Sequence, residues 1–534
     1  MTRAADVIAE RLYRAGVRHA FGIPGGEVLT LIDALERAGI RVFLARHENA
    51  AGFMAEGAWH ATGAPGVLVA TVGPGLANCV NVVANAQQDR VPLIVISGAI
   101  PEAEALRYSH QVFDHRAVLR PLVKAGFEAR PGACDVMIDK AVRIALDPQP
   151  GPVHVDLPVP VAATEHGAGG AAGRAALSPA APAPGRDLAA ARAMLAGAER
   201  PLIVAGRDIL DEPGAVDALR HVMRRLGIPV LTTYKAKGVI PEDDPLCLLG
   251  HGLSPRSDAL VKPLLAASDC VICAGYDPIE MRAGWQDPWD PARCIELAAV
   301  PDNHYLHQAR LMWACGIGAG LMALTEGLEP RRLWPGDAPA TTRAALDAAF
   351  APGPDWGPAQ AIALLDRMKP ADLVTTVDSG AHRILLSQMW RCGAPRTLLQ
   401  STGLCTMGCA LPMAIGFALA SGRRTLAVTG DGGLEMVLGE LATLRDLGLP
   451  VTVCVLNDAS LALIEMKQRR EGLANAAVDT GRSDHAAVAR ALGLAAHRAT
   501  GAAELEAALA AAFAHDGPSL IDVVLPRRAY DGLI

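Results

Sequence analysis

The sequence predicts an α/β protein made of three doubly wound, parallel-sheet domains. Its 534 residues are enough for about three domains of ordinary size, and 51% of them are apolar. Short apolar runs bounded by glycine and proline recur along the chain, and helical patterns separate them, as expected for repeated βαβ units. Two stretches rich in Ala, Gly and Pro divide the chain into three parts.

The first predicted domain covers residues 1–161. Residues 41–45 are predicted to form a strand, and 49–61 have the small side chains of a buried helix. The run 151–158 reads as a closing strand, and a linker is expected at 162–186.

The second predicted domain covers residues 187–335. Its apolar runs at 201–206, 228–233 and 269–275 are short enough to be buried strands of a Rossmann-like sheet. A second linker is expected at 336–355, and a third domain at 356–534.

The third domain contains the pattern that is most informative about function. Residues 425–429 form a predicted strand, leucines and a valine at three- and four-residue intervals predict one amphipathic helix over 434–447, and 451–456 form the next strand. Right-handed crossovers bring the carboxyl ends of parallel strands to one edge, so Asp431 and Asp458 are expected to lie close together.

Two carboxylates at one sheet edge suit a hard cation such as Mg²⁺, which takes one or two carboxylates together with phosphate oxygens. Gly430, Gly432 and Gly433 leave room for phosphate oxygens to reach backbone N–H groups. A lone Gly-Asp-Gly would be equally consistent with an ordinary turn and a helix-capping Asp.

The stretch from Thr429 to Asp458 resembles the diphosphate motif of thiamine diphosphate enzymes of the acetolactate synthase (acetohydroxyacid synthase) and decarboxylase superfamily, and the resemblance runs nearly end to end. It implies a pyrimidine-binding first domain, a Rossmann-like central domain and a diphosphate-binding third domain. The cofactors it implies are thiamine diphosphate and Mg²⁺.

The family's metal ligands map onto three residues. The motif Asp is Asp431, the residue 27 positions later is Asp458, and the main-chain carbonyl two residues further on is that of Ser460. Most members carry Asn where this chain has Asp458, and both are hard oxygen ligands.

A second resemblance surrounds Glu48. The segment 46–58, followed by Ala70-Thr-Val-Gly-Pro-Gly75, is similar to the family's cofactor-activating region. It implies that Glu48 hydrogen-bonds N1′ of the aminopyrimidine and promotes loss of the thiazolium C2 proton. The alternative is a carboxylate that merely caps a helix.

Other cofactor contacts are implied by position. Met407 matches the bulky residue that bends the cofactor, and Gly380, Ala381 and His382 match a turn that contacts the diphosphate. Ordinary core packing for Met407 and an ordinary βα loop for 380–382 are the alternatives.

The residues expected to contact the substrate match the family pattern less closely. Gln111 lies 63 residues after Glu48, as the active-site Gln of acetolactate synthases does, while His110 and His115 on either side of it could act as acids or bases, as histidines do in decarboxylases. Gly25 matches a glycine turn that admits substrate. Glu27 is unusual at its position and is either a second acid/base or a solvent-facing helix start.

The resemblance implies a carboligase that decarboxylates a 2-oxo acid, with pyruvate the expected donor, and joins the resulting enamine to a second 2-oxo acid. A non-ligating decarboxylase or aldehyde lyase is the alternative, and a catalytically silent cofactor-binding paralogue is a third possibility. Lys467 is a candidate for binding the acceptor carboxylate, with an exposed helix face as its alternative.

Residues 274–280 resemble the corresponding segment of catabolic, flavin-independent acetolactate synthases, and no Gly-x-Gly-x-x-Gly fingerprint occurs there, so FAD is not expected.

Net charge and hydropathy restrict the partners. A net charge of −7 and a pI near 6.1 argue against nucleic-acid binding, and no 18-residue apolar run suggests a membrane span. The amino terminus lacks a signal-peptide pattern, so the 11 cysteines are expected to be thiols in the cytoplasm. The family resemblance implies a homodimer or homotetramer in which Glu48 of one chain meets Asp431 of another.

Overall fold

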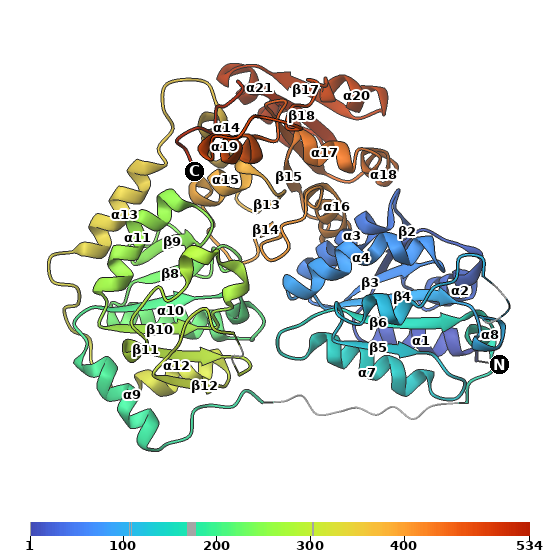
Figure 1. The fold of residues 1–534 in the computed structure, drawn as a ribbon, viewed down its shortest axis with the longest axis horizontal. Coiled ribbons are helices and arrows are strands. Elements are labelled where there is room, and N and C mark those ends of the chain that lie inside the picture. Colours follow the sequence, from blue (N-terminus) through green and yellow to red (C-terminus); the bar gives the residue numbers. More distant parts are fainter. Residues whose placement is uncertain (1, 106, 108, 168–177, 302–303) are drawn as a thin grey trace.

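The computed structural model describes residues 2–105, 107, 109–167, 178–301 and 304–534, which form three lobes (Figure 1). Each lobe is built on a six-stranded sheet, and every strand pairing between neighbours is parallel. The predicted α/β class with three doubly wound domains is confirmed.

The first lobe contains a sheet of order β2-β1-β3-β4-β6-β5. Its strands are β1 (His19–Gly22), β2 (Arg41–Leu44), β3 (Gly66–Ala70), β4 (Leu93–Ala99), β5 (Ala125–Glu128) and β6 (Val153–Pro158). Its helices are α1 (Ala4–Arg14), α2 (Leu29–Arg37), α3 (Glu48–Thr62), α4 (Pro74–Gln88), α5 (Glu102–Ala105), α6 (His115–Leu119), α7 (Cys134–Leu146) and α8 (Val159–Ala163), with one 3₁₀ turn η1 (Gly26–Val28).

The central lobe has the strand order β12-β11-β10-β7-β8-β9, which is the Rossmann order. Its strands are β7 (Pro201–Ala205), β8 (Val230–Thr233), β9 (Cys247–His251), β10 (Cys270–Ala274), β11 (Cys294–Ala298) and β12 (Leu311–Ala314). Its helices are α9 (Arg186–Gly197), α10 (Ala215–Leu226), α11 (Pro255–Ala267), α12 (Ile317–Thr325) and α13 (Ala338–Ala349), with 3₁₀ turns η2 (Arg207–Leu210), η3 (Pro278–Glu280), η4 (Ala283–Trp285) and η5 (Pro291–Arg293).

The third lobe repeats the topology of the first, with the order β14-β13-β15-β16-β18-β17. Its strands are β13 (Val374–Val377), β14 (Leu398–Gln400), β15 (Thr425–Gly430), β16 (Val451–Asn457), β17 (Ala495–Ala499) and β18 (Ser519–Val524). Its helices are α14 (Pro358–Met368), α15 (Ala381–Met389), α16 (Ala410–Ser421), α17 (Asp431–Met436), α18 (Glu440–Leu447), α19 (Ala462–Arg470), α20 (His485–Ala491) and α21 (Ala502–Ala514).

This shared topology decides where ligands can enter. In an open parallel sheet, a crevice forms at the carboxyl ends of two neighbouring strands whose connections leave in opposite directions. In the first lobe these strands are β1 and β3, and in the third lobe they are β13 and β15. The loops that follow these four strands therefore form the two natural sites.

The first and third lobes share one core through helices α3 and α16, which lie against each other between the two sheets (Figure 1). Glycines let the two backbones touch. A Cβ added at Gly416 would lie 1.9 Å from the Met54 carbonyl oxygen, and one at Gly57 would lie 2.1 Å from that of Met413. The apolar composition of α16 on all sides is thus explained by the burial of residues 410–418.

One predicted helix is interrupted. Residues 434–447 do not form a single helix, because the chain turns at 437–439 between α17 and α18. The turn brings Glu440 to the first lobe, where its carboxylate accepts backbone N–H bonds from Arg46 and His47 at 2.9 and 3.2 Å. A tertiary contact therefore overrides the helical periodicity.

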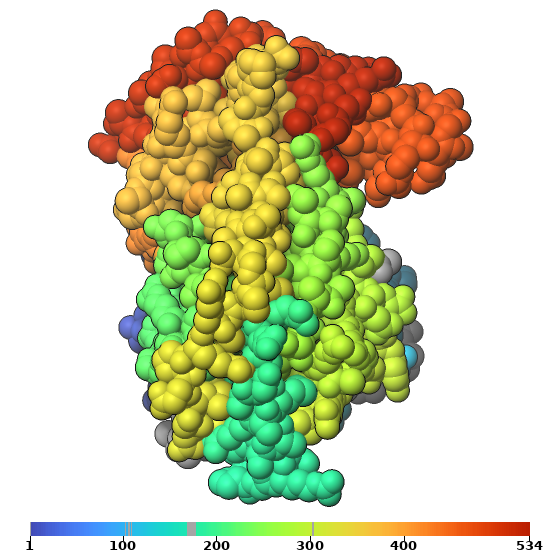
Figure 2. Space-filling model, turned by 90° about the vertical axis from the view of Figure 1, so that its left-hand side faces the viewer, coloured from blue at the N-terminus to red at the C-terminus, as the bar shows by residue number. Residues whose placement is uncertain are grey.

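The two expected linkers differ in structure. Of residues 162–186, the described parts hold the end of α8 and an isolated bridge between Arg3 and Glu165, whereas 168–177 lie outside the described residues. Residues 336–355 instead carry α13, which packs against α11 and climbs along the central lobe (Figure 2). Arg343 anchors it by donating to the carbonyl oxygens of Cys247 and Glu242.

Candidate functional site

The crevice between β13 and β15 contains a pocket of about 190 Å³. Three loops at the carboxyl ends of the strands line most of it: 379–382 after β13, 430–433 after β15 and 456–464 at the end of β16. All the cofactor residues predicted in the third domain lie on this lining, namely Gly380, Ala381, His382, Met407, Gly430, Asp431, Gly432, Gly433, Asp458 and Ser460.

The two carboxylates of this pocket are both buried. Asp431 and Asp458 are 4% and 3% exposed. Burial, followed by the neighbouring Asp431, raises the pKa of Asp458 to about 7, and burial also raises the pKa of Asp431. Thr480 donates to Asp431 at 3.2 Å, whereas the buried Oδ2 of Asp458 has no hydrogen-bond partner among the described residues. Facing carboxylates with an unsatisfied oxygen fit a divalent cation, which would neutralise both.

The glycines of the pocket have close neighbours. A Cβ at Gly433 would lie 2.0 Å from Oδ2 of Asp378, and one at Gly430 would lie 3.2 Å from the His382 ring. Burial, and then the charge of Arg383, lowers the pKa of His382 to about 3, so its ring is neutral at pH 7. A larger residue at Gly430 or Gly433 would collide with these neighbours, so the loop 430–433 presents backbone to the pocket. A bound diphosphate needs such open access to backbone N–H groups.

The crevice of the first lobe gathers four of the predicted catalytic residues, Gly25, Glu27, Glu48 and Gln111, around one corner, which is formed by residues 71–75 from the end of β3 into the first turn of α4. Glu27 accepts a hydrogen bond of 2.5 Å from Thr71 Oγ1, and a Cβ at Gly25 would lie 2.2 Å from the same oxygen. A Cβ at Gly73 would lie 2.4 Å from the Gln111 carbonyl oxygen. Substrate-side residues from three separate loops therefore meet at this corner.

Glu48 lies on the other side of the same corner, at the first residue of α3. It is 7% exposed, and Asn78 Nδ2 donates to its Oε2 at 2.9 Å. Oε1 lies 3.5 Å from a Cβ position built on Gly75. The side chain is thus buried in the wall of the crevice instead of capping a helix in solvent.

The histidines near Gln111 differ from each other. His110 is exposed, next to Gln111, which is also exposed. His115 is buried, its Nε2 accepts the backbone N–H of Gly73 at 3.1 Å, and its Nδ1 lies 2.9 Å from Asp156 Oδ1. Both ring nitrogens are therefore engaged inside the protein, and this does not support the acid/base role considered for His115.

Lys467 does not reach the third-domain pocket. It is exposed on α19, whereas Leu463 of the same helix lines the pocket. Its expected role in binding an acceptor carboxylate is therefore unsupported, and the alternative of an exposed helix face describes it.

Sequence patterns missed two kinds of site residue. Thr71 and Asn78 lie in or just after the recognised first-lobe segment, but their importance depends on the partners they meet, Glu27 and Glu48. Tyr530 closes the third-lobe pocket from the carboxyl-terminal tail. No signal near Tyr530 in the sequence links it to the motif around Asp431.

The two crevices remain separate within the described part of one chain. The residues that line the third-lobe pocket come from the third lobe alone, although the lobes pack together through α3 and α16. One chain thus carries two separate candidate sites, one rich in glycine and carboxylate and one centred on Glu48.

Models of thiamine pyrophosphate enzymes match all three lobes: the N-terminal TPP binding domain matches residues 2–118, the central domain 188–312 and the C-terminal TPP binding domain 378–523. No helix in the described ranges combines the length and the apolar character needed to cross a membrane.

Among curated proteins, isozyme 1 of the acetolactate synthase large subunit from Escherichia coli (strain K12) is 32% identical, over 97% of this chain and 93% of that protein. Acetolactate synthase from Bacillus subtilis (strain 168) is 29% identical, over 98% and 93%. Probable 2-ketoarginine decarboxylase AruI from Pseudomonas aeruginosa is 30% identical, over 97% and 93%. The chain therefore belongs to the thiamine pyrophosphate enzymes, and its relatives include the acetolactate synthases.

Proposed function

We propose that this enzyme is an acetolactate synthase-like carboligase, which decarboxylates a 2-oxo acid, with pyruvate as donor, and joins the remaining fragment to a second 2-oxo acid. Bound thiamine diphosphate supplies the carbanion chemistry of both steps. The residues of the chain orient the substrates, exclude water and control the protons.

The observation that carries this proposal is the state of His115. A non-ligating decarboxylase must protonate the fragment that remains after CO₂ leaves, whereas a carboligase must keep it unprotonated until the acceptor arrives. His115 is buried with both ring nitrogens occupied, whereas Gln111, whose backbone contacts Gly73 at that corner, is exposed, as is the neighbouring His110. An amide orients a carbonyl without transferring a proton.

Glu27 favours a second candidate, a decarboxylase. Its carboxylate is half-buried at the same corner, where Thr71 donates to it, and this places a candidate acid/base group beside Gly25. The similarity to a 2-ketoarginine decarboxylase agrees with such an activity. In either reaction, we propose that Glu48 hydrogen-bonds the aminopyrimidine ring of the cofactor.

We further propose that Mg²⁺ binds Asp431, Asp458 and the carbonyl of Ser460. The unsatisfied Oδ2 of Asp458 and the effect of the Asp431 charge on the Asp458 carboxyl support this ligand set. Gly380, Ala381, His382 and the loop 430–433 would hold the diphosphate, and Met407 would support the bend between the rings.

We propose that the enzyme works without FAD. At the switch point of the central sheet, where a dinucleotide would enter, the backbones of Gly206 and Gly275 touch, because a Cβ at Gly206 would lie 2.3 Å from the Gly275 carbonyl oxygen. Tyr276, Trp289 and His307 pack together beside this point, with ring centroids 5.1 to 5.6 Å apart. An absorption band near 450 nm in the purified protein would contradict this proposal.

The complete site is proposed to form between two chains, which makes a homodimer or homotetramer the active unit. The third-lobe pocket around Asp431 is lined by third-lobe residues alone, and its separation from the first-lobe corner around Glu48 within one chain supports this arrangement. Sedimentation with thiamine diphosphate and Mg²⁺ tests it, and a fully active monomer would refute it.

The decisive experiment incubates the purified protein with thiamine diphosphate, Mg²⁺ and pyruvate, follows CO₂ release and identifies products by mass. Acetolactate from the wild type, lost in Glu48→Gln, is expected. Acetaldehyde alone would establish the decarboxylase. Cofactor binding without turnover of any 2-oxo acid would indicate a catalytically silent protein.

A further inference from the structure

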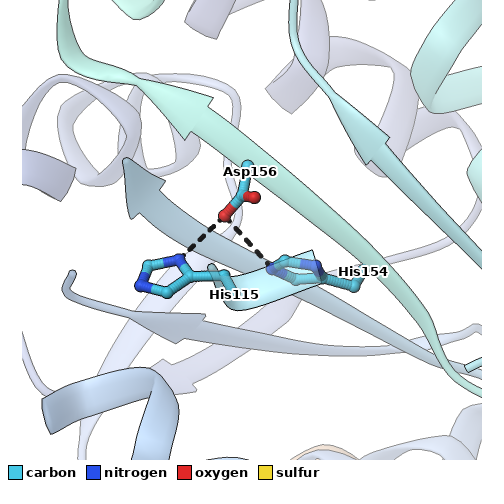
Figure 3. Close-up of side chains that lie close together, drawn as sticks. All are labelled: His115, His154 and Asp156. Atoms are coloured by element: carbon cyan, nitrogen blue, oxygen red, sulfur yellow. Dashed lines mark hydrogen bonds and ion pairs between the residues drawn. The ribbon is translucent and has the colours of Figure 1, made fainter. Parts of the chain in front are cut away.

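A buried cluster of His115, His154 and Asp156 (Figure 3) contacts the first-lobe corner through the hydrogen bond from Gly73 to His115. His115 comes from α6, whereas His154 and Asp156 lie on β6. Asp156 Oδ1 is 2.9 Å from His115 Nδ1 and 3.4 Å from His154 Nε2, and it accepts a hydrogen bond of 2.9 Å from Ser97 Oγ. None of these side chains lines the proposed cofactor pocket.

The hydrogen bonds define the tautomer of His115. The backbone N–H of Gly73 donates to Nε2 at 3.1 Å, so this nitrogen carries a lone pair. The ring proton is therefore on Nδ1, where it is donated to Asp156. Burial alone would raise the pKa of Asp156, but the hydrogen bond from His115 and the neighbouring histidines hold it below its ordinary value, so the acceptor is ionised.

The glycine that His115 holds is in direct contact with Gln111. A Cβ at Gly73 would lie 2.4 Å from the Gln111 carbonyl oxygen and 2.9 Å from its Cβ. Both backbones are left-handed, with φ of +70° at Gly73 and +60° at Gln111, and for a residue other than glycine this conformation needs support from its surroundings. Two residues further along, Gly75 lies against Glu48.

We propose that His115, held by Asp156, is a positioning residue that fixes Gln111 relative to Glu48 through the backbone of Gly73. This inference rests on the proposed function, because it makes Gln111 the group that orients a substrate carbonyl. The chain between Gln111 and His115 is then attached to the corner at both ends, and the exposed Gln111 amide is presented in one orientation.

A metal ion is the competing explanation. Ligand atoms of His115, His154 and Asp156 all lie within 4.8 Å of one another. A metal on Nδ1 of His115 would, however, displace the proton that this nitrogen donates to Asp156. Because Nε2 is already an acceptor for Gly73, the hydrogen-bonded arrangement satisfies the ring without an ion.

Two variants test the hydrogen bonds of His115 to Gly73 and to Asp156 one at a time. In His115→Gln, the amide oxygen can take the place of Nε2 and accept from Gly73, whereas in His115→Asn the shorter amide can take the place of Nδ1 and reach only Asp156. We expect His115→Asn to lower kcat/KM by about 10- to 100-fold through misplacement of Gln111, and His115→Gln to retain most of it. Thiamine diphosphate affinity stays unchanged in both.

Matched controls give the comparison its meaning. His251 is also buried with both ring nitrogens bonded, to Ser257 and to the Leu248 carbonyl, but it lies in the central lobe. We expect His251→Asn to keep the wild-type kinetics. In a Gln111→Ala background, His115→Asn should add little further loss, because the two changes act through one group.

Amide exchange of residues 71–75 and 109–115 provides a readout independent of turnover. We expect faster exchange there in His115→Asn and near wild-type exchange in His115→Gln. Three results would each overturn the proposal. The first is an equal loss of kcat/KM in both variants with unchanged amide exchange, and the second is additive losses of kcat/KM for His115→Asn and Gln111→Ala. The third is one bound zinc ion per chain that His115→Asn removes. If the wild type does not turn over pyruvate, the proposed function fails, while the exchange measurement still decides the role of His115.

Discussion

Replacement of Asp458 by Asn tests the electrostatics of the third-lobe pocket. Burial and the neighbouring Asp431 raise the pKa of Asp458 from 3.8 to about 7 in the folded protein. Below the unfolded pKa both states are protonated, so this group has no effect on stability. Between the two values the unfolded chain has released its proton and the folded chain has not, so the free energy of unfolding falls as pH rises.

The expected loss is about 1.4 kcal/mol per pH unit, and about 4 kcal/mol over the whole interval. This sum is an upper limit, because Asp431 titrates together with Asp458. Asn removes the ionisation and keeps the shape of the side chain. The variant should therefore match the wild type near pH 4 and exceed it progressively up to pH 7.

The assay is thermal unfolding of both proteins without metal or cofactor, in EDTA, from pH 4 to 8. For a folding unit of 150–250 residues, about 2–4 °C in Tm corresponds to 1 kcal/mol, so a difference of several degrees is expected at pH 7. Asp243→Asn, at an exposed position, is the control and should show a flat profile. A Tm difference that is independent of pH, or that favours the wild type at pH 7, would refute the reasoning.

Three further predictions concern other parts of the molecule. Gly416→Ala places a Cβ 1.9 Å from the Met54 carbonyl oxygen, so urea unfolding should show a loss of about 1–3 kcal/mol in the free energy of unfolding, through the α3–α16 interface. Gly481→Ala, with open space around it, should show no such loss, and equal stability of the two variants would contradict the packing argument. Burial, and then the charge of Asp89, raises the pKa of Glu56 to about 8, so the free energy of unfolding of the wild type falls as pH rises from 4.5. Glu56→Gln removes this ionisation and should raise Tm more at pH 8 than at pH 5. An equal rise at both pH values would contradict this pKa argument. Asp431→Asn should weaken Mg²⁺-dependent binding of thiamine diphosphate more than 10-fold in calorimetric titration, with Glu435→Gln as a control outside the pocket lining; unchanged affinity would exclude Asp431 as a ligand.

Local patterns were sufficient for the strands. Apolar runs at 201–206 and 451–456 correspond to β7 and β16, because strands buried on both faces need uninterrupted apolar sequence. Helix interruptions were less predictable. The turn at 437–439 depends on Glu440 meeting the backbone of Arg46, almost 400 positions away in the chain, and helical periodicity carries no information about such a contact.

The sequence by itself determined the α/β class, the division into three lobes and the glycine and carboxylate residues that follow β13, β15 and β16, because these depend on local periodicity and on motifs that follow individual strands. Tertiary structure alone decided which side chains have partners. It buried His115 against Gly73 and Asp156, joined Glu27 to Thr71 and left Lys467 in solvent. The physical reason is that burial and hydrogen bonding depend on which strand ends become neighbours, and that order is a property of the folded sheet.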